Sequence, residues 1–515
     1  MQSDLEEAQE EVHSFLKSGV AFEGVAPELL VTHGNRLFLT KTRVYKMKRA
    51  VDFGWMDFST LAKREAACRQ ELALNRRTAP DLYLGVEPVT READGRLAVK
   101  GQGEPLEWLV CMRRFHQADR LDRLLESGQL TDVNLRRLAD DLAVFHATAE
   151  PTPARGGVAL ARKVTAENAA DLARAPTVFD AEAVAALTDK TTAFFDRYGP
   201  LADARAETGQ TRRCHGDLHL ANIVMWEGRA LPFDCIEFNE AFSAIDPLYD
   251  LAFLLMDLEQ RGRRDLANLV LNRWLALSDP PFAELPGLAL LPGFLSLRAA
   301  IRAKVTGLEW LDPKRSDHTD LARRGQAYLD LALRYLEPPN PCLVAVGGLS
   351  GSGKSTLAQA LAPDLGAAPG ALVLRSDVLR KRLFGVMPEE HLPPEAYSPA
   401  WHERVQAALL EQAETALRSG QAVVLDAVQS DARVRAEVAD LGHRLGLPAQ
   451  GIWLEAPLDI LQARVTARSG DASDATAAVV AKQAEDCQVP EDWIRLDARG
   501  TPKAVLAAAR QRLGC

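Results

Sequence analysis

The chain has 515 residues, of which 47% are hydrophobic and 26% charged, and its net charge at pH 7 is −10. This composition is that of a globular protein, and the chain lacks the biased tracts that would indicate disorder. Its length suggests about three folding units of ~150 residues. The excess of Asp and Glu over Lys and Arg argues against general affinity for nucleic acid, which needs a basic surface.

The cysteines and the N-terminus indicate the compartment. The seven cysteines form no C-x-x-C pair and show no metal-type spacing with histidine. We therefore expect small core residues in a reducing compartment. Residues 1–7 are acidic and lack a signal sequence, and no uninterrupted apolar stretch reaches membrane-spanning length. The sequence predicts a cytoplasmic protein without a membrane partner and leaves its oligomeric state open.

The first third of the chain shows a β-rich pattern that gives way to helices. Strands are expected at 30–32, 36–40, 43–48, 82–86 and 108–112, with a helix over 59–77. From Arg120 onward the pattern is mostly helical. A small β-rich lobe, ending at about residue 115, followed by a larger helical lobe is the order of the α+β protein-kinase-like fold.

Two lysines on the third strand are candidates for the phosphate-binding lysine of such a fold. Lys46 and Lys48 lie on one face of the strand, because side chains alternate. We favour Lys46, since it ends the segment Arg-Val-Tyr-Lys, in which the lysine has the same position as in the kinase motif V-A-I-K. Its acidic partner on the following helix is either Glu65 or Glu71. No G-x-G-x-x-G loop joins the first strands, and residues 32–36 are the nearest substitute.

The helical lobe carries the segment Cys-His-Gly-Asp-Leu-His-Leu-Ala-Asn at residues 214–222. Its Asp-x-x-x-x-Asn spacing matches the kinase catalytic loop. Asp217 would accept or orient the proton of an acceptor hydroxyl, and Asn222 would hold a metal ion. Asp234 follows a short strand at the place of the Mg²⁺-binding aspartate. The alternative is a His/Asp network that only braces a loop.

At these residues the chain resembles the aminoglycoside phosphotransferase family, in which H-G-D-x-H-x-x-N is a hallmark. The resemblance spans roughly residues 25 to 335. It implies the fold of that family and ATP-dependent phosphorylation of small molecules.

A proline-rich segment at 336–341 ends the last helix of this part. We place the domain boundary at Glu337/Pro338. The predicted division is a kinase-like domain at 1–337 and a second domain at 338–515.

The second domain opens with a strand, a glycine-rich loop and a helix. The loop satisfies G-x-x-x-x-G-K-[ST], and its backbone N–H groups would cradle the phosphates of ATP. Lys354 would reach the β- and γ-phosphates, and the Ser355 hydroxyl would bind Mg²⁺. The predicted nucleotide-binding residues are Gly348, Leu349, Ser350, Gly351, Ser352, Gly353, Lys354, Ser355 and Thr356.

Further short apolar runs at 372–374, 422–425 and 451–454 alternate with helical stretches. This order predicts an α/β domain with a parallel sheet covered on both faces. Ligands bind at the carboxyl ends of such strands, where Asp377 and Asp426 lie.

Asp377 and Arg380 stand one helical turn apart and resemble the acceptor side of small P-loop kinases, including gluconate, zeta-toxin-like and polynucleotide kinases. By that resemblance Asp377 is the base, Arg380 clamps a substrate anion and Asp426 holds Mg²⁺ through water. Otherwise Asp377 caps a helix with a basic face. Arg464 and Arg468 lie four apart and would neutralise the transferring phosphoryl group, or form ordinary salt bridges.

The whole chain thus resembles bacterial fusions of an aminoglycoside phosphotransferase with an ATP-binding domain. We expect two sites that use ATP and Mg²⁺ to phosphorylate hydroxyls of small polar molecules. One alternative is a nucleotide-binding regulator in which one or both domains do not turn over. The other is a nucleic-acid-end kinase in the second domain, which the acidic charge opposes.

Overall fold

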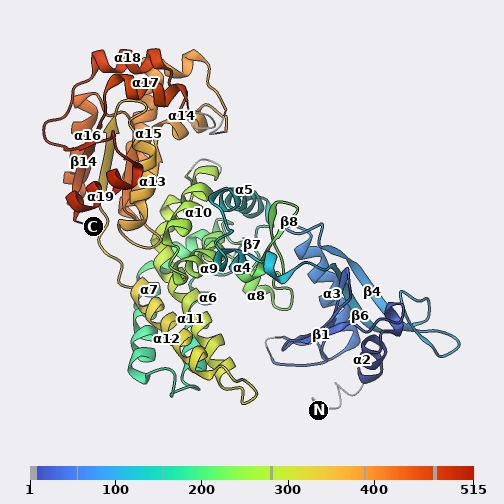
Figure 1. The fold of residues 1–515 in the computed structure, drawn as a ribbon. Helices are drawn as coiled ribbons and strands as arrows, with labels where there is room; N and C mark the ends of the chain where they lie inside the picture. The colour runs from blue at the N-terminus through green and yellow to red at the C-terminus, as the bar shows by residue number, and fades with distance from the viewer. Residues whose placement is uncertain are drawn as a thin grey trace. The chain divides into compact units, whose positions relative to one another are not determined.

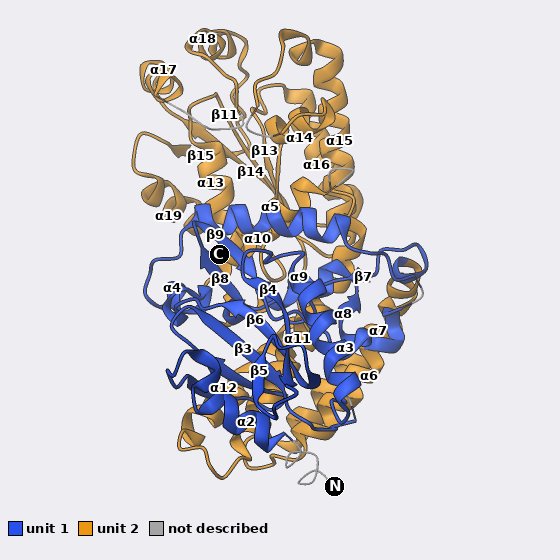
Figure 2. Ribbon diagram, turned by 90° about the vertical axis from the view of Figure 1, so that its right-hand side faces the viewer, with its two compact units in different colours: residues 1–160, 205–254 blue, residues 161–204, 255–515 orange. Residues whose placement is uncertain are grey.

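A computed structural model describes residues 9–54, 56–153, 155–278, 282–387, 390–467 and 473–514 (Figure 1). The chain divides into two compact units (Figure 2). Unit 1 comprises residues 1–160 and 205–254, and unit 2 comprises residues 161–204 and 255–515. The predicted boundary at 337/338 lies inside unit 2 and stays a prediction about domains.

Unit 1 is built on an antiparallel sheet of six strands in the order β1-β2-β3-β6-β4-β5. Its strands are β1 (Glu28–Val31), β2 (Asn35–Leu39), β3 (Arg43–Lys48), β4 (Tyr83–Arg91), β5 (Leu97–Val99) and β6 (Glu104–Arg113). Helix α3 (Leu61–Asn75) packs against β4 and β6. Strand β5 was not predicted, because three partly exposed residues give no alternating pattern.

The rest of unit 1 is mainly helical and contains residues 214–222, the segment whose spacing matches a kinase catalytic loop (the catalytic-loop segment). Its elements are α2 (Glu10–Lys17), α4 (Leu121–Glu126), α5 (Asp132–Thr148), β7 (Arg212–Arg213), β8 (Ile223–Trp226), β9 (Arg229–Pro232), α8 (Glu240–Ser243) and β10 (Ala244–Ile245). Three helices cross from one unit to the other: α6 (Gly157–Leu172), α7 (Ala181–Glu207) and α9 (Pro247–Gln260). Strands β8 and β9 form a hairpin between Asn222 and Asp234. The two predicted metal ligands therefore flank the open end of the hairpin, one before β8 and one after β9.

Unit 2 joins residues 161–204 and the helices that follow residue 255 to a five-stranded parallel sheet in the order β12-β13-β11-β14-β15. Its helices before the sheet are α10 (Arg264–Leu277), α11 (Leu291–Trp310) and α12 (His318–Tyr335). The strands are β11 (Leu343–Gly348), β12 (Leu372–Arg375), β13 (Val423–Asp426), β14 (Ala449–Glu455) and β15 (Ile494–Asp497). The parallel sheet confirms the predicted P-loop kinase fold.

Helices α13 and α19, and helices α15 and α16, pack in pairs and contact the sheet. The helices of this part are α13 (Lys354–Leu361), α14 (Ser376–Leu383), α15 (Pro399–Arg418), α16 (Ala432–Leu445), α17 (Leu458–Thr466), α18 (Ala477–Asp486) and α19 (Pro502–Leu513). Strands β11, β12 and β13 are apolar because both faces of the sheet are covered.

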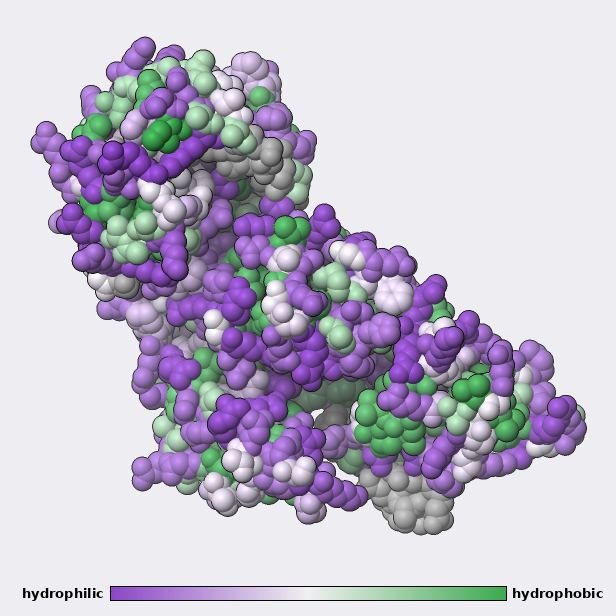
Figure 3. Space-filling model, in the orientation of Figure 1, coloured by the Kyte–Doolittle hydropathy of each residue, from purple (hydrophilic) through white to green (hydrophobic). Residues whose placement is uncertain are grey.

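The face drawn in Figure 3 is mostly hydrophilic, with smaller apolar areas between the polar side chains. Among the described residues, no helix is both long and apolar enough to cross a membrane.

Candidate functional site

The two lysines of β3 share one buried glutamate. Lys46 Nζ donates to Glu71 Oε1 at 2.9 Å and to Asp234 Oδ1 at 2.7 Å. Lys48 Nζ donates to Glu71 Oε2 at 2.5 Å and also to Glu237. Burial disfavours both ammonium groups, but the facing carboxylates outweigh it and raise the pKa of each lysine. Lys46, the lysine favoured from the sequence, is the one that also reaches Asp234.

The structure also separates the two candidate glutamates. Glu71 is fully buried, whereas Glu65 pairs with Arg69 at 2.8 Å on a more exposed part of α3. Burial would raise the pKa of Glu71, but Lys46 and Lys48 outweigh it and lower that pKa. The sequence left the choice open, and the buried face of α3 itself carries polar residues such as Glu71.

His215 connects the catalytic-loop segment to the chain before Asp234. Its Nδ1 accepts the Asp217 N–H at 3.3 Å, and its Nε2 donates to the Phe233 carbonyl at 3.0 Å. This pattern requires a neutral imidazole, and burial lowers the pKa of His215. The histidine therefore acts as a fixed spacer between the two acidic segments.

Asn222 holds Asp217 in place. Its Nδ2 donates to Asp217 Oδ2 at 2.8 Å and to the Asp217 carbonyl at 3.1 Å. The Asn222 carbonyl accepts the N–H of Phe233 at 2.9 Å, which closes the β8–β9 hairpin. Since the amide nitrogen faces Asp217, the amide oxygen is the atom available to a cation.

Asp234 adopts a left-handed conformation, with φ of 62°. This conformation is costly for a residue other than glycine and is frequent at functional sites. The Asp234 N–H donates to the Tyr83 hydroxyl at 3.1 Å. Its carboxylate is about half exposed, and that of Asp217 about one third. Carboxylate and amide oxygens of this kind fit Mg²⁺.

Asp250 of α9 braces the loop, a role that the sequence analysis did not assign. Its carboxylate accepts the N–H groups of His215 at 3.0 Å and Gly216 at 2.8 Å. His146 Nε2 of α5 lies 3.1 Å from the same carboxylate. These groups, with the Cys214 thiol, also lie close enough to hold a metal ion. The backbone contacts favour a bracing role. An aspartate within the apolar run of α9 was the available sequence signal.

The P-loop follows β11 and leads into α13. Gly348 and Gly351 have φ of 136° and 85°, and an added Cβ would meet the carbonyls of Leu454 at 2.7 Å and Leu461 at 2.5 Å. Only glycine fits these two positions. Lys354 Nζ donates to the Leu349 carbonyl at 3.0 Å.

Gln483 of α18 is a further residue at this loop that the sequence analysis missed. Its Oε1 accepts the Ser350 N–H at 3.0 Å. A single glutamine in a helix gives no sequence signal for such a contact.

Arg375 brings together the two predicted Mg²⁺-binding residues of the P-loop site. Its Nη2 donates to Ser355 Oγ at 3.1 Å, and its Nε donates to Asp426 Oδ2 at 3.1 Å. Strands β12 and β13 pair Arg375 with Asp426 in register. The two oxygens face one cationic group and are of the type that Mg²⁺ prefers, so they fit a magnesium ion. Arg375 had no predicted role.

Asp377 and Arg380 occupy the first turns of α14. Burial raises the pKa of Asp377, and the nearby Asp426 carboxylate raises it further. Arg380 is only 4% exposed; its Nη1 donates to the Ala396 carbonyl at 2.8 Å, and its Nη2 lies 3.4 Å from His402 Nδ1. Its Nε has no hydrogen-bond partner among the described residues. A buried guanidinium with neutral hydrogen-bonding partners suits an anion.

Of the two arginines predicted to neutralise the transferring phosphoryl group, the structure describes Arg464. Arg464 Nη2 donates to the Ala498 carbonyl at 2.9 Å, just beyond β15. This contact does not join Arg464 to the P-loop, and its role in phosphoryl transfer stays a prediction. Arg468 lies outside the described residues.

Asp474 forms a polar cluster that the sequence did not predict. It accepts hydrogen bonds from the Tyr397 hydroxyl at 2.6 Å and the Leu392 N–H at 3.2 Å. The buried Lys381 ammonium and His391 Nδ1 lie 3.2 and 2.8 Å from its carboxylate. The cluster holds the segment that begins at residue 473 against the one around residue 392, close to Arg380.

Comparison with known families identifies two kinds of domain in the chain. The model of the phosphotransferase enzyme family matches residues 50–288, and that of an AAA domain matches residues 343–490. The protein is therefore a fusion of an aminoglycoside-phosphotransferase-like kinase domain with a P-loop kinase domain, which confirms the predicted resemblance.

An uncharacterized protein of Mycobacterium tuberculosis is 30% identical over 462 residues, covering 87% of this chain and 88% of the relative. An uncharacterized protein of Mycobacterium bovis matches to the same extent. The chain belongs to the same family as these mycobacterial proteins.

Two further similarities concern the P-loop part. An adenylyl-sulfate kinase of Myxococcus xanthus is 34% identical over 120 residues, which cover 23% of this chain and 59% of the kinase. The match to the structure of the Mycobacterium tuberculosis APS kinase in complex with AMPPNP and APS covers 34% of this chain and 99% of the kinase chain. Its sequence identity is 22% and its TM-score 0.27.

Proposed function

We propose that the chain is an ATP-dependent phosphotransferase with two nucleotide sites. Each site would transfer the γ-phosphoryl group of Mg-ATP to a hydroxyl of a small polar molecule. The two family matches support phosphoryl transfer in general. The hydroxyl acceptor and the second active site are our inference from the geometry.

One observation carries the proposal for the first site: its four predicted residues form a connected arrangement. Lys46 bonds Asp234, Asn222 bonds Asp217, and the β8–β9 hairpin holds Asn222 close to the chain before Asp234. Phosphoryl transfer needs a cation, metal ligands and a hydroxyl-orienting carboxylate at one place. A loop that only braces the fold needs no partly exposed carboxylates, yet Asp217 and Asp234 keep theirs partly exposed.

Each of these residues receives one role. Asp217 orients the acceptor hydroxyl and takes its proton, while Asn222 and Asp234 would hold Mg²⁺. Lys46, held by Glu71, directs its ammonium group to the phosphates. Bound Mg²⁺ would neutralise charge on the transferring phosphoryl group.

At the second site, the P-loop and Lys354 would hold the phosphates, and Ser355 and Asp426 would hold Mg²⁺. Asp377 follows the carboxyl end of β12, next to Asp426, and would face the acceptor hydroxyl. Arg380, buried among neutral hydrogen-bonding partners, would bind an anionic group of the acceptor.

A specific feature favours the regulator alternative for the first site. The β1–β2 connection is a short turn in which the Asn35 N–H donates to Thr32 Oγ1 at 3.1 Å. Arg49 Nη1 donates to the carbonyls of Thr32 and His33 at 3.2 and 2.9 Å. This turn, held by Arg49, differs from a glycine-rich phosphate-covering loop. Under the regulator alternative, the first site would bind ATP without turnover.

The proposal is tested by transfer of labelled γ-phosphate from ATP to a panel of aminoglycosides, sugars, nucleosides, hydroxylated anions and a 5′-hydroxyl oligonucleotide. We expect one class of acceptor to be lost in Asp217→Asn and another in Asp377→Asn. Transfer to the oligonucleotide faster than to every small acceptor would replace the second assignment with a nucleic-acid-end kinase. Absence of transfer by Lys354→Ala to any acceptor would favour the regulator at the first site.

Arg380→Ala sharpens the second assignment. Because Arg380 would contact the acceptor and not ATP, we expect a KM for the acceptor raised about 10–100-fold with the KM for ATP unchanged, the loss typical of one charge-assisted contact. Arg404→Ala, on the neighbouring helix α15, is the matched control, and its parameters should remain those of the wild type. An unchanged acceptor KM in Arg380→Ala would contradict the anion-binding role.

A further inference from the structure

Helix α10 carries a stripe of polar side chains on one face. Arg264, Asn268 and Asn272 are spaced four residues apart, which places them one above another along the helix. Asn268 is only 3% exposed. Buried amides of this kind need hydrogen-bond partners, and a row of them indicates a polar contact with another element.

The partner of this stripe is the backbone that leads into β12. Asn268 Nδ2 donates to the Ala371 carbonyl at 2.9 Å, and Asn272 Nδ2 donates to the same carbonyl at 3.2 Å. The Val373 N–H donates to Asn272 Oδ1 at 2.7 Å. Asn272 therefore supplies both an acceptor and a donor, as the backbone of an adjoining strand would.

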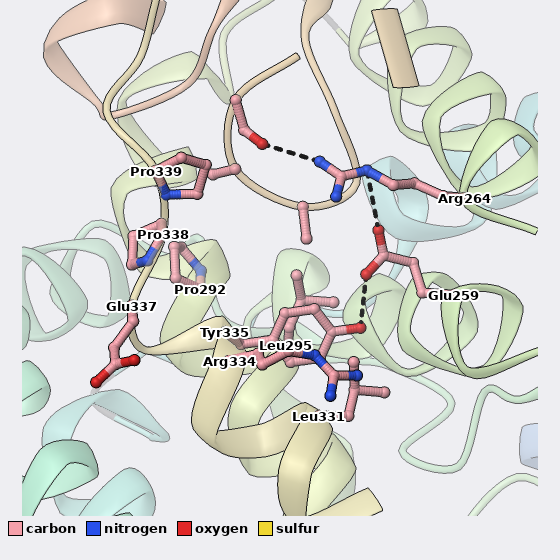
Figure 4. A pocket seen from close by; sticks show the side chains of 13 residues that line it. Glu259, Arg264, Pro292, Leu295, Leu331, Arg334, Tyr335, Glu337, Pro338 and Pro339 are labelled. Atoms are coloured by element: carbon pink, nitrogen blue, oxygen red, sulfur yellow. Dashed lines mark hydrogen bonds and ion pairs between the residues drawn. The ribbon is translucent and has the colours of Figure 1, made fainter. Parts of the chain in front are cut away.

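Arg264 extends the contact by one turn. Its Nη2 donates to the Gly366 carbonyl at 2.9 Å, and its Nε lies 3.5 Å from the Glu259 carboxylate. Glu259 also accepts the hydroxyl of Tyr335 at 2.9 Å. Figure 4 shows this chain of contacts at the side of a pocket of about 290 Å³, whose lining includes Pro338. Helices and sheet of unit 2 are thus joined by directional bonds.

Strand β12 is an edge of the parallel sheet, paired through β13 alone. The outer side of an edge strand presents unpaired N–H and C=O groups, and it moves more freely than an inner strand. The carboxyl end of β12 carries Arg375, and Asp377 follows in the first turn of α14. Whatever fixes the outer edge of β12 therefore also fixes these two residues.

We propose that Asn268 and Asn272 are positioning residues for the P-loop site, because they hold β12 and through it Asp377. This inference rests on the proposed function of Asp377. Helix α10 lies within the residues matched by the phosphotransferase enzyme family, and β12 within those matched by the AAA domain. The acceptor side of the second site is therefore completed by the first family's segment.

The test is hydrogen–deuterium exchange of the full chain, comparing peptides that cover residues 371–377 with peptides of β11 at 343–348. In Asn272→Ala we expect about tenfold faster exchange in 371–377, the factor that loss of one hydrogen bond of ordinary net strength gives. Exchange in 343–348 should not change. Asn268→Ala should have a smaller effect, since Asn272 also reaches the Ala371 carbonyl. Asp265→Asn, an exposed position of α10, is the matched control.

A second readout separates positioning from general destabilisation. In an Asp217→Asn background, kcat for hydrolysis of Mg-ATP, with water as acceptor, should fall about tenfold in Asn272→Ala. The affinity for Mg-ATP should stay within about twofold, and Asn272→Asp, which keeps an oxygen for the Val373 N–H, should restore part of kcat.

Wild-type exchange in 371–377 of Asn272→Ala, or equal acceleration across 343–348 and 371–377, would overturn the inference. If Asp377→Asn leaves turnover unchanged while the exchange result holds, the proposed function of Asp377 fails and the contact of α10 with β12 stands.

Discussion

The kinase-like site of unit 1 takes its positive charge from side chains, whereas the P-loop site takes much of it from backbone N–H groups of one loop and the start of α13. Lys46 is oriented by Glu71 and Asp234, which lie 25 and 188 residues further along the chain. The P-loop residues that would surround a phosphate are contiguous in sequence.

This difference determines how each site depends on the rest of the fold. The first site exists only when β3, α3 and the segment after β9 are packed together, because each contributes at least one member of the ion-pair network. The P-loop forms from local backbone geometry once β11 and α13 are in place. Substitutions that disrupt the first site should therefore reduce both stability and activity. Substitutions in the P-loop should reduce activity with little effect on stability.

The largest expected effect concerns Asp217. Asp217→Asn keeps the size of the side chain but removes the carboxylate that would orient the hydroxyl and take its proton. We expect kcat at the first site to fall by about 10³–10⁴, while Mg-ATP binding is retained. The measurement is phosphate transfer in a Lys354→Ala background, which silences the P-loop site.

Asp141→Asn is the control for Asp217→Asn, because Asp141 is an exposed carboxylate of α5 paired with Arg229. Its kcat should equal that of the parent. If Asp217→Asn also keeps the kcat of the parent, Asp217 has no catalytic role.

The two glutamates of α3 should differ in stability. Glu71→Gln leaves two buried ammonium groups that retain only Asp234 and Glu237, so we expect a loss of about 3 kcal/mol in the free energy of unfolding. Glu65→Gln breaks an ion pair with Arg69 at the surface and should cost less than about 1 kcal/mol. Chemical denaturation followed by circular dichroism measures both. Equal losses would show that the shared carboxylate does not hold the first site together.

Lys354→Ala tests the P-loop, and its effect on the free energy of ATP binding should be smaller than the effect of Asp217→Asn on catalysis. The substitution removes one charge-assisted contact to the phosphates, which corresponds to about 10–100-fold weaker binding of ATP at this site. The unfolding free energy should stay close to that of the wild type, because the loop backbone is unaffected. Titration with a fluorescent ATP analogue measures this affinity, in an Asp234→Ala background that weakens binding at the first site. An affinity equal to that of the wild-type P-loop site would contradict the role of Lys354 in phosphate binding.

The sequence predicted what contiguous residues encode. The P-loop, the strand–helix order of its domain and the catalytic-loop spacing all lie within short windows, and the fold confirms both domain types. Strands β5 and β15 were missed, since short and partly exposed strands give little periodicity.

Contacts between distant segments could not be predicted in this way. The choice between Glu65 and Glu71 depended on which face of α3 packs against the sheet, and that face includes buried polar residues. Asp250 and Asn272 each bond backbone N–H groups far away in the sequence. Such contacts follow from tertiary packing, and a single sequence shows only an isolated polar residue in an apolar helix.

Calorimetric titration of the full chain with Mg²⁺ and AMPPNP tests the central claim of two separate nucleotide sites most directly. We predict two high-affinity nucleotides per wild-type chain and one in either Lys354→Ala or Asp234→Ala, because each substitution weakens binding at one site. The double variant should retain no high-affinity site. A wild-type stoichiometry of one nucleotide per chain would contradict the account.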